Sequence, residues 1–217
     1  MTTATLENQA PATRRRRDPE ATKEAILEAA EKLFVELGPS ATPTSLVAKE
    51  AGVTKSLIHH HFGSKEDLWL AVRRRHFERY HEAQLQMLKS HEGDAESLLR
   101  QSIVAYFQYL KEDTNAARFM AWRTIEDEDP CLDLEHELFS LGIERLKSAQ
   151  ERGEVRSDLE PLAIIKTFLA MGLHWYQTKN QLCELCQQIP GLDPENLTDE
   201  SYLEDSLKIF FEGIKAR

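Results

Sequence analysis

The chain has 217 residues, of which 41% are hydrophobic and 29% charged, and its formal net charge is -10. This composition is typical of a soluble globular protein with one large or two small domains, and it excludes a fibre and a disordered chain. No apolar run approaches the roughly 20 residues that span a bilayer, and the first residues lack the apolar core of a secretion signal. We therefore expect a cytoplasmic protein with no membrane partner.

Charge is unevenly distributed along the chain. Residues 1–90 hold 14 Lys and Arg against 12 Asp and Glu, a balance of +2, whereas residues 91–217 hold 13 against 25, a balance of -12. Affinity for phosphate depends on a local basic face and not on the total charge. The distribution is therefore compatible with an N-terminal part that binds nucleic acid and an acidic remainder.

Residues 1–19 are predicted to form a flexible basic arm. Arg14, Arg15, Arg16 and Arg17 are four consecutive cations, which repel one another when they are packed together. Such an arm can contact phosphates or the minor groove, with Arg16 and Arg17 as the candidates, or it can serve only as a solubilising tail. The sequence leaves both interpretations open.

A helix and a short second helix are predicted after this arm. Apolar residues recur at helical spacing over residues 22–37, and Gly38 ends that helix. Thr42 is predicted to cap the short helix, with Pro43 at its first position. Gly52 can then adopt the positive φ that a tight connection to a third helix requires.

The third helix is predicted to present a polar face. Thr54 caps it, and the spacing of Val53, Leu57 and Ile58 predicts that these three side chains face a core. Ser64 is predicted to cap the next helix, where the cation Lys65 opposes the helix dipole, so we expect an external partner for it. Short polar or donor-bearing side chains, which can contact phosphates and base edges, remain on the open side of the third helix. They are Thr54, Lys55, Ser56, His59 and His60.

These residues carry a resemblance to a known family. The run Thr42, Val47-Ala48, Ala51-Gly52-Val53-Thr54, Ile58, His61-Phe62 and Lys65 resembles the DNA-binding domain of the TetR family of bacterial transcriptional regulators. The resemblance covers the N-terminal third of the chain. It implies an all-α fold in which a three-helix helix-turn-helix domain, residues 20–66, is joined by a long helix to a ligand-binding and dimerisation domain, residues 67–217.

The resemblance also implies a function. A member of this family is expected to bind a palindromic operator in double-stranded DNA as a homodimer, usually as a repressor, and to leave it when a small-molecule effector binds. Thr42, Ser45 and Lys65 join the third-helix residues as candidate DNA contacts. The alternative is a helical interaction or scaffold protein of the same fold, which would show neither base preference nor salt-dependent DNA binding.

Three positions depart from the family pattern. His59 stands where a Tyr is usual, Ser56 where Gly is frequent, and Ser45 where a longer polar residue is frequent. The imidazole of His59 can make a DNA contact depend on pH. The operator therefore cannot be copied from another family member.

Helical periodicity continues to the end of the chain. We find neither a convincing strand nor a Gly-rich phosphate loop, so the predicted fold class is all-α. The predicted helices are residues 65–90, 96–111, 115–126, 132–152, 159–179 and 201–215.

Aromatic and polar side chains in three of these helices are the candidates for the effector site. Aromatic residues at helical spacing often belong to a plain core, so packing and ligand contact both remain open for each of them. Partly buried polar side chains need a hydrogen-bond partner, in the protein or on a ligand. The aromatic character favours a mainly apolar or aromatic effector. The candidates are Tyr106, Phe107, Phe119, Trp122, Arg123, Phe168, Met171, His174 and Trp175.

The last two helices are rich in apolar residues, which indicates more apolar surface than one small bundle buries. A two-fold dimer interface would cover the excess, and the alternative is a monomeric core. The residues concerned are Leu162, Ile165, Phe168, Leu169, Gly172, Leu203, Leu207, Phe210, Phe211 and Ile214.

No metal site, cofactor or catalytic group is predicted. Successive residues of a helix diverge by about 100°, so His59, His60 and His61 cannot converge on one ion. Cys183 and Cys186 lack a second pair, and they are interpreted either as structural or incidental residues or as a thiol sensor. The acidic residues 126–129 lack an ordered nucleophile or histidine. We assign no function to residues 180–200, which are predicted to form an added lobe.

Overall fold

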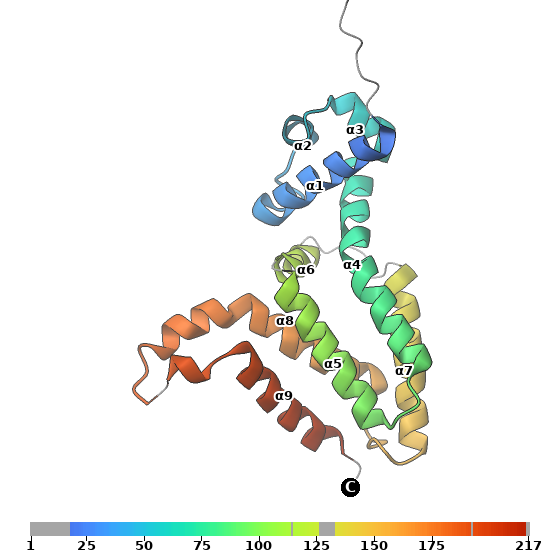
Figure 1. Cartoon of the computed structure of the whole chain (residues 1–217), viewed down its shortest axis with the longest axis vertical. Helices are drawn as coiled ribbons and strands as arrows, with labels where there is room; N and C mark the ends of the chain where they lie inside the picture. The colour runs from blue at the N-terminus through green and yellow to red at the C-terminus, as the bar shows by residue number, and fades with distance from the viewer. Residues whose placement is uncertain (1–17, 114, 126–132, 192, 216–217) are drawn as a thin grey trace, which may run out of the picture.

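The computed structural model describes residues 18–113, 115–125, 133–191 and 193–215 (Figure 1). The described residues form nine α-helices and one short 3-10 helix, and their only β-type pairing is a bridge between Val155 and Lys215. The all-α prediction is confirmed. No helix within these ranges is both long and apolar enough to cross a membrane. The predictions for Arg16, Arg17 and the acidic residues 126–129 fall outside the described residues.

Three helices form an N-terminal domain at one end of the molecule, and five helices form a C-terminal domain at the other (Figure 1). A single long helix, α4, runs from one domain into the other. The helices are α1 (Pro19–Leu37), α2 (Thr44–Glu50), α3 (Lys55–Phe62), α4 (Lys65–Ser90), α5 (Ala95–Glu112), α6 (Ala116–Ile125), α7 (Asp133–Glu151), α8 (Pro161–Cys186) and α9 (Asp199–Ile214), with the 3-10 helix η1 (Pro194–Asn196) before α9.

Local chemistry explains where the helices of the N-terminal domain begin and end. Asp18 caps α1 by accepting a hydrogen bond from the amide of Glu20 (3.0 Å), and Gly38 ends it at a φ of 85°. Ser64 and Asp67 form the predicted capping box at the start of α4. One apolar core joins the three helices to the first turns of α4, and it includes Ile26, Phe34, Val47, Ile58, Leu68 and Val72.

Two details of the N-terminal domain differ from the sequence prediction. Pro43, and not Thr42, occupies the cap position of α2, which has no side-chain cap. Thr42 is instead completely buried, and its hydroxyl donates to the carbonyl oxygen of Gly38 (2.7 Å). Leu57 was expected to face the core together with Ile58, but it is 36% exposed.

The C-terminal domain is built around α5, which packs against α8, α4 and α9. Its main core draws on α5, α7, α8 and α9 and contains Ile103, Phe107, Phe168, Trp175, Phe210 and Phe211. A second cluster links Tyr80 of α4 to Tyr106 and Leu110 of α5. The helical prediction is therefore correct here, with bounds that shift by a few residues except at the end of α8.

The end of α8 occupies the first third of the predicted lobe. The helix continues to Cys186, so Cys183 and Cys186 lie in its final turns, where both are free and partly exposed. Only a turn and η1 separate α8 from α9. Of residues 180–200, the first third thus extends α8, and the rest connects it to α9 through η1.

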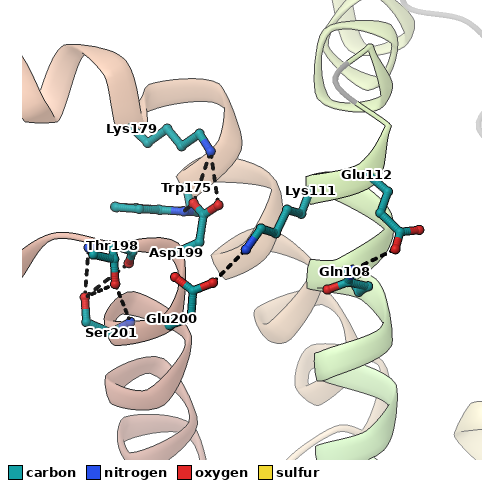
Figure 2. A network of polar contacts seen from close by, with 9 residues as sticks. All are labelled: Gln108, Lys111, Glu112, Trp175, Lys179, Thr198, Asp199, Glu200 and Ser201. Carbon is teal, nitrogen blue, oxygen red and sulfur yellow. Dashed lines mark hydrogen bonds and ion pairs between the residues drawn. The ribbon is translucent and has the colours of Figure 1, made fainter.

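A polar network attaches the start of α9 to its neighbours (Figure 2). Asp199 accepts hydrogen bonds from the indole of Trp175 (2.8 Å) and from Lys179 (3.1 Å), both on α8. Glu200 binds Lys111 of α5 at 2.6 Å. Because Trp175 also stacks on Tyr202 with ring centroids 4.2 Å apart, α8 and α9 are held together within one chain.

The predicted dimer residues mostly serve the core of the single chain. Ile165, Phe168, Gly172, Leu207, Phe210, Phe211 and Ile214 are buried without a second subunit. The argument from excess apolar surface was therefore wrong for these seven positions. Of the predicted residues, Leu162 of α8 is 48% exposed, and Ile209 of α9, which was not predicted, is 74% exposed.

Candidate nucleic-acid interface and ligand cavity

The open face of α3 carries the polar side chains that the sequence placed there. Thr54 caps the helix by accepting from the amide of Leu57 (3.4 Å), and its hydroxyl also lies 2.9 Å from that of Ser56. Lys55, Ser56, His59 and His60 are all exposed, whereas Ile58 between them is 1% exposed. The geometry gives a short helix anchored by one apolar residue with donors and acceptors facing solvent.

His59 is oriented by the residue that ends the helix. Its Nδ1 lies 2.7 Å from the carbonyl oxygen of Gly63, which has a φ of 81°. A carbonyl oxygen only accepts, so Nδ1 carries the proton and donates. In the neutral ring Nε2 is then an acceptor, and in the charged ring it becomes a donor.

Lys65 has partners inside the protein. Its ammonium donates to the carbonyl oxygens of Pro39 (3.1 Å) and Ser40 (3.4 Å) in the loop between α1 and α2. These bonds explain a cation in the first turn of α4 without any external partner, which corrects the argument from the helix dipole. An ammonium group has three protons, so one donor of Lys65 remains available to a phosphate.

The two remaining candidates near α2 differ in accessibility. Ser45 is exposed in the first turn of α2. Thr42 is fully buried, and both of its hydroxyl contacts are with carbonyl oxygens of α1 and its end, Leu33 and Gly38. Thr42 thus supports the N-terminal domain from inside and cannot reach DNA, and we withdraw it as a DNA contact.

Two of the predicted ligand residues lie at the junction between the domains. The indole of Trp122, on α6, donates to the carbonyl oxygen of Val35 at the end of α1 (3.2 Å). The ring centroids of Phe119 and of Trp69, on α4, lie 4.5 Å apart, and Phe119 is buried in the core of the N-terminal domain. Neither residue lines the cavity described below, so α6 serves here to hold the N-terminal domain.

A buried histidine strengthens this junction. The Nδ1 of His76, on α4, lies 2.8 Å from a carboxylate oxygen of Asp113 at the end of α5, and its Nε2 lies 3.2 Å from one of Glu31 on α1. Burial opposes the charged ring, but the two carboxylates outweigh it and raise the pKa of His76 to about 9. His76 is thus a cation held between one carboxylate from each domain.

A cavity of about 220 Å³ lies in the C-terminal domain, between α4, α5, α6, α7 and α8. Of the nine predicted ligand residues, Tyr106, Arg123 and Phe168 line it. Phe107 and Trp175 are buried in the adjoining core, Met171 packs against that core, and His174 is exposed. The predicted candidates lie on three of the five helices around this cavity, and six of the nine do not line it.

Several lining residues were missed because they lie on α4, which was interpreted as the connecting helix, and on α7, where no candidate was named. α4 contributes Phe77, Tyr80, Gln84 and Leu88, which follow one another at intervals of three or four residues. That spacing marks one face of a helix and could have indicated a buried wall. Glu135 and further residues of α7 line the same cavity.

The charged groups around the cavity are held by the protein itself. Arg123 forms an ion pair with Glu135, which is only 6% exposed. The guanidinium of Arg145 donates to the carbonyl oxygen of Leu88 twice, at 2.9 and 2.6 Å. Burial raises the pKa of Tyr106, so its phenol stays neutral. The cavity is therefore mainly apolar, with its cations already bound.

Both domains match models of known protein families. A model of the tetR family of bacterial regulatory proteins matches residues 26–72, and a model of the tetracyclin repressor-like C-terminal domain matches residues 99–189. The first match spans the helix-turn-helix and the start of α4. The second spans α5 to the end of α8, which includes three of the helices that enclose the cavity and much of a fourth.

Individual relatives agree with the family models. The transcriptional activator FasR of Mycolicibacterium smegmatis is 33% identical over 44% of this chain and 43% of its own length, so the match spans less than half of that relative. The transcriptional repressor BepR of Brucella suis biovar 1 is 29% identical over 69% of this chain and 76% of its own.

A solved structure extends the similarity of fold to nearly the whole chain. The crystal structure of AibR in complex with isovaleryl coenzyme A and operator DNA has a TM-score of 0.65 and 19% identity, and the match covers 87% of this chain and 97% of that one. With the two family models in chain order on the two domains, the chain belongs to the TetR family of bacterial transcriptional regulators.

Proposed function

We propose that the protein is a sequence-specific DNA-binding transcriptional regulator that acts as a homodimer on a palindromic operator. The observation that carries this proposal is the face of α3, where Lys55, Ser56, His59 and His60 are exposed beside the buried anchor Ile58. Two such helices related by a two-fold axis would enter successive major grooves about 34 to 36 Å apart. Ser45 and the free donor of Lys65 would add phosphate contacts.

The proposed control is release from DNA when a small, mainly apolar effector occupies the cavity. The same helix, α4, forms part of the cavity wall and continues into the core of the N-terminal domain. A shift of α4 would change the separation of the two α3 helices in the dimer. An effector achieves this only if it binds one arrangement better, by about 5.5 kcal/mol for a nearly complete switch.

Repression is the proposed direction of control, because a dimer that covers a promoter blocks transcription by occupancy alone. Of the relatives, BepR is named a repressor and FasR an activator. The AibR structure contains both an acyl coenzyme A and operator DNA, which is the pairing of effector and operator that this proposal invokes.

Selection of bound duplexes from a random DNA pool, at physiological salt, tests the proposal. We expect enrichment of a palindromic consensus. Lys55→Ala should change or weaken that enrichment, whereas Lys208→Ala, an equally exposed lysine on α9 at the far end of the molecule, should leave it unchanged. No enrichment above background by the unaltered protein would instead indicate an interaction protein of the same fold.

A further inference from the structure

Among the described residues, the arginines that line the cavity in the C-terminal domain already have partners within the protein. Arg123 is paired with Glu135, and the guanidinium of Arg145 is occupied by backbone carbonyl oxygens, including that of Leu88. Arg152, a third lining cation, binds Glu154 at 2.5 Å. A ligand carboxylate that took Arg123 would leave Glu135 buried and unpaired, which is strongly unfavourable.

The remaining charged lining residues lie at the rim. Lys166 and Asp94 are both exposed, and Asp94 already caps α5 by accepting from the amide of Ser97 (2.8 Å). A charge on a ligand could therefore be met only where solvent also reaches it. Inside the cavity, a ligand anion would have to displace the backbone carbonyl oxygens from Arg145 or Glu135 from Arg123.

Neutral polar groups occupy the wall formed by α4 and α5. Gln84 is 3% exposed, and its amide nitrogen makes only a long contact of 3.5 Å with the carbonyl oxygen of Ser102. Among the residues that the structure describes, the side-chain carbonyl of Gln84 and the hydroxyl of Ser102 have no hydrogen-bond partner, although both residues line the cavity. The hydroxyl of Tyr106, which also lines the cavity, donates to the sulfur of Met120 at 3.5 Å.

The side-chain carbonyl of Gln84 and the hydroxyl of Ser102 are not among the fully buried, unpartnered atoms of the described residues, so they are open to the cavity, where another molecule can supply the bond. An amide and a hydroxyl can both donate and accept. They can therefore bind a ligand hydroxyl, carbonyl or amide group, while the surrounding rings and aliphatic side chains contact its apolar part.

We infer that the effector is an uncharged, mainly apolar molecule with one hydroxyl, carbonyl or amide group that hydrogen-bonds to Gln84 and Ser102. The inference rests on the proposed function, since it specifies the ligand of the cavity that controls DNA binding. It separates neutral compounds from carboxylates, acyl phosphates and organic cations of the same size.

Direct binding to the full-length protein, without DNA, tests the inference. A matched series of probes is measured by calorimetry at neutral pH: 4-phenyl-2-butanone and 4-phenyl-2-butanol as neutral compounds, 3-phenylpropanoate as the anion, and 3-phenylpropylammonium as the cation. We expect the Kd of the ketone and of the alcohol to be at least about tenfold lower than that of either charged probe.

A variant then locates the polar contact. Gln84→Leu keeps the size of the side chain but removes the amide, so the affinity for the ketone should fall about five- to tenfold. The affinity for n-butylbenzene, which has no polar group, should stay the same or rise. Gln108→Leu is the matched control, because Gln108 lies on the exposed side of α5 and does not line the cavity (Figure 2).

Three results would overturn the inference. One is tighter binding of 3-phenylpropanoate than of the ketone. If Lys166→Ala then lost that binding, the carboxylate of the ligand would lie at the rim. Another is an equal effect of Gln84→Leu on the ketone and on n-butylbenzene, and the third is no binding by either neutral probe at millimolar concentration. Failure of the proposed function is distinct, because it appears as absence of operator binding by the unliganded protein.

Discussion

Individual side chains on α3 and at the start of α4 differ in what they can contribute to DNA recognition. Lys55 is exposed and makes no ion pair or hydrogen bond among the described residues, so its ammonium is free for a base edge. Lys65 already donates to two loop carbonyl oxygens and has one donor to spare. The two lysines should therefore respond differently to removal.

Lys55→Ala should relax preference at one base pair, with a loss of about 1 to 3 kcal/mol for the preferred base, if its ammonium contacts guanine. Lys65→Ala should weaken binding to all sequences about equally and lower the salt slope by about 1. Titrations of the selected operator and of single-base variants at several salt concentrations measure both effects. An equal loss on every sequence would show that Lys55 contacts only phosphate.

His59 should make operator binding depend on pH. Because Nδ1 donates to Gly63, protonation converts Nε2 from an acceptor to a donor that can bind a phosphate or a guanine. We expect operator affinity to rise as pH falls from about 8 to about 6. His59→Gln should remove most of that rise, and His174→Gln, an exposed histidine on α8, should not. A flat profile for the unaltered protein would contradict the cationic contact.

At the scale of helices, helix boundaries could be predicted from the sequence, whereas the burial of single residues could not. The start and end of α4 were predicted correctly because a capping box and local periodicity define them. The single-residue error at Thr42 arose because Thr42 and Thr44 both flank a proline, and only packing decides which of them is buried. Local sequence is therefore a good guide to helices and a weaker one to single positions.

The cavity could be predicted only as to its domain. Phe119, Trp122 and Tyr106 share the aromatic character of a cavity wall, yet the first two pack on the N-terminal domain and only the third reaches the cavity. The difference depends on which distant helix covers each face, and no local pattern contains that information. For the same reason, the ion pairs of His76 with Glu31 and Asp113 were not predicted.

The contacts of His76 with Glu31 and Asp113 should make the free energy of unfolding depend on pH. A folded-state pKa of about 9 for His76 lies above the value of about 6.5 for an unfolded histidine. Its contribution is therefore complete below about pH 6.5 and is lost as pH rises through about 9, up to about 3 kcal/mol. Urea unfolding from pH 6 to pH 9.5 measures this change.

Two variants isolate the contribution of His76. His76→Gln can still form hydrogen bonds but carries no charge, so the fall in stability between pH 6 and pH 9.5 should become smaller. The exposed His174→Gln should behave like the unaltered protein. If all three proteins lose stability equally over this range, other groups cause the loss.

At the scale of the whole molecule, the proposed homodimer depends on surface that a single chain leaves open. Most apolar residues of α8 and α9 close the core of their own chain, and the network around Asp199 fixes the two helices together. Ile209 remains 74% exposed on α9 and Leu162 48% exposed on α8. These two side chains, on a preformed pair of helices, are our candidates for the centre of the interface between subunits.

Ile209→Glu should weaken the dimer, because it would place a charge in an apolar interface. Sedimentation velocity should show a shift toward monomer, and operator affinity should fall with it, since half-sites are bound cooperatively only by a dimer. Val104→Glu, an equally apolar and 41% exposed position on α5, is the control and should leave the dimer intact. A dimer of Ile209→Glu with unchanged affinity would place the interface elsewhere.

The contact between Gly38 and Trp122 has a consequence for engineering. A Cβ atom at Gly38 would lie 2.8 Å from the indole of Trp122, whose nitrogen also needs the carbonyl oxygen of Val35. The N-terminal domain of a relative is therefore not an interchangeable part: a chimera built by exchanging residues 18–63 must match this indole as well as α4. Biosensors with altered operators are better made by changing only the exposed residues of α3, which leaves the seam between the domains untouched.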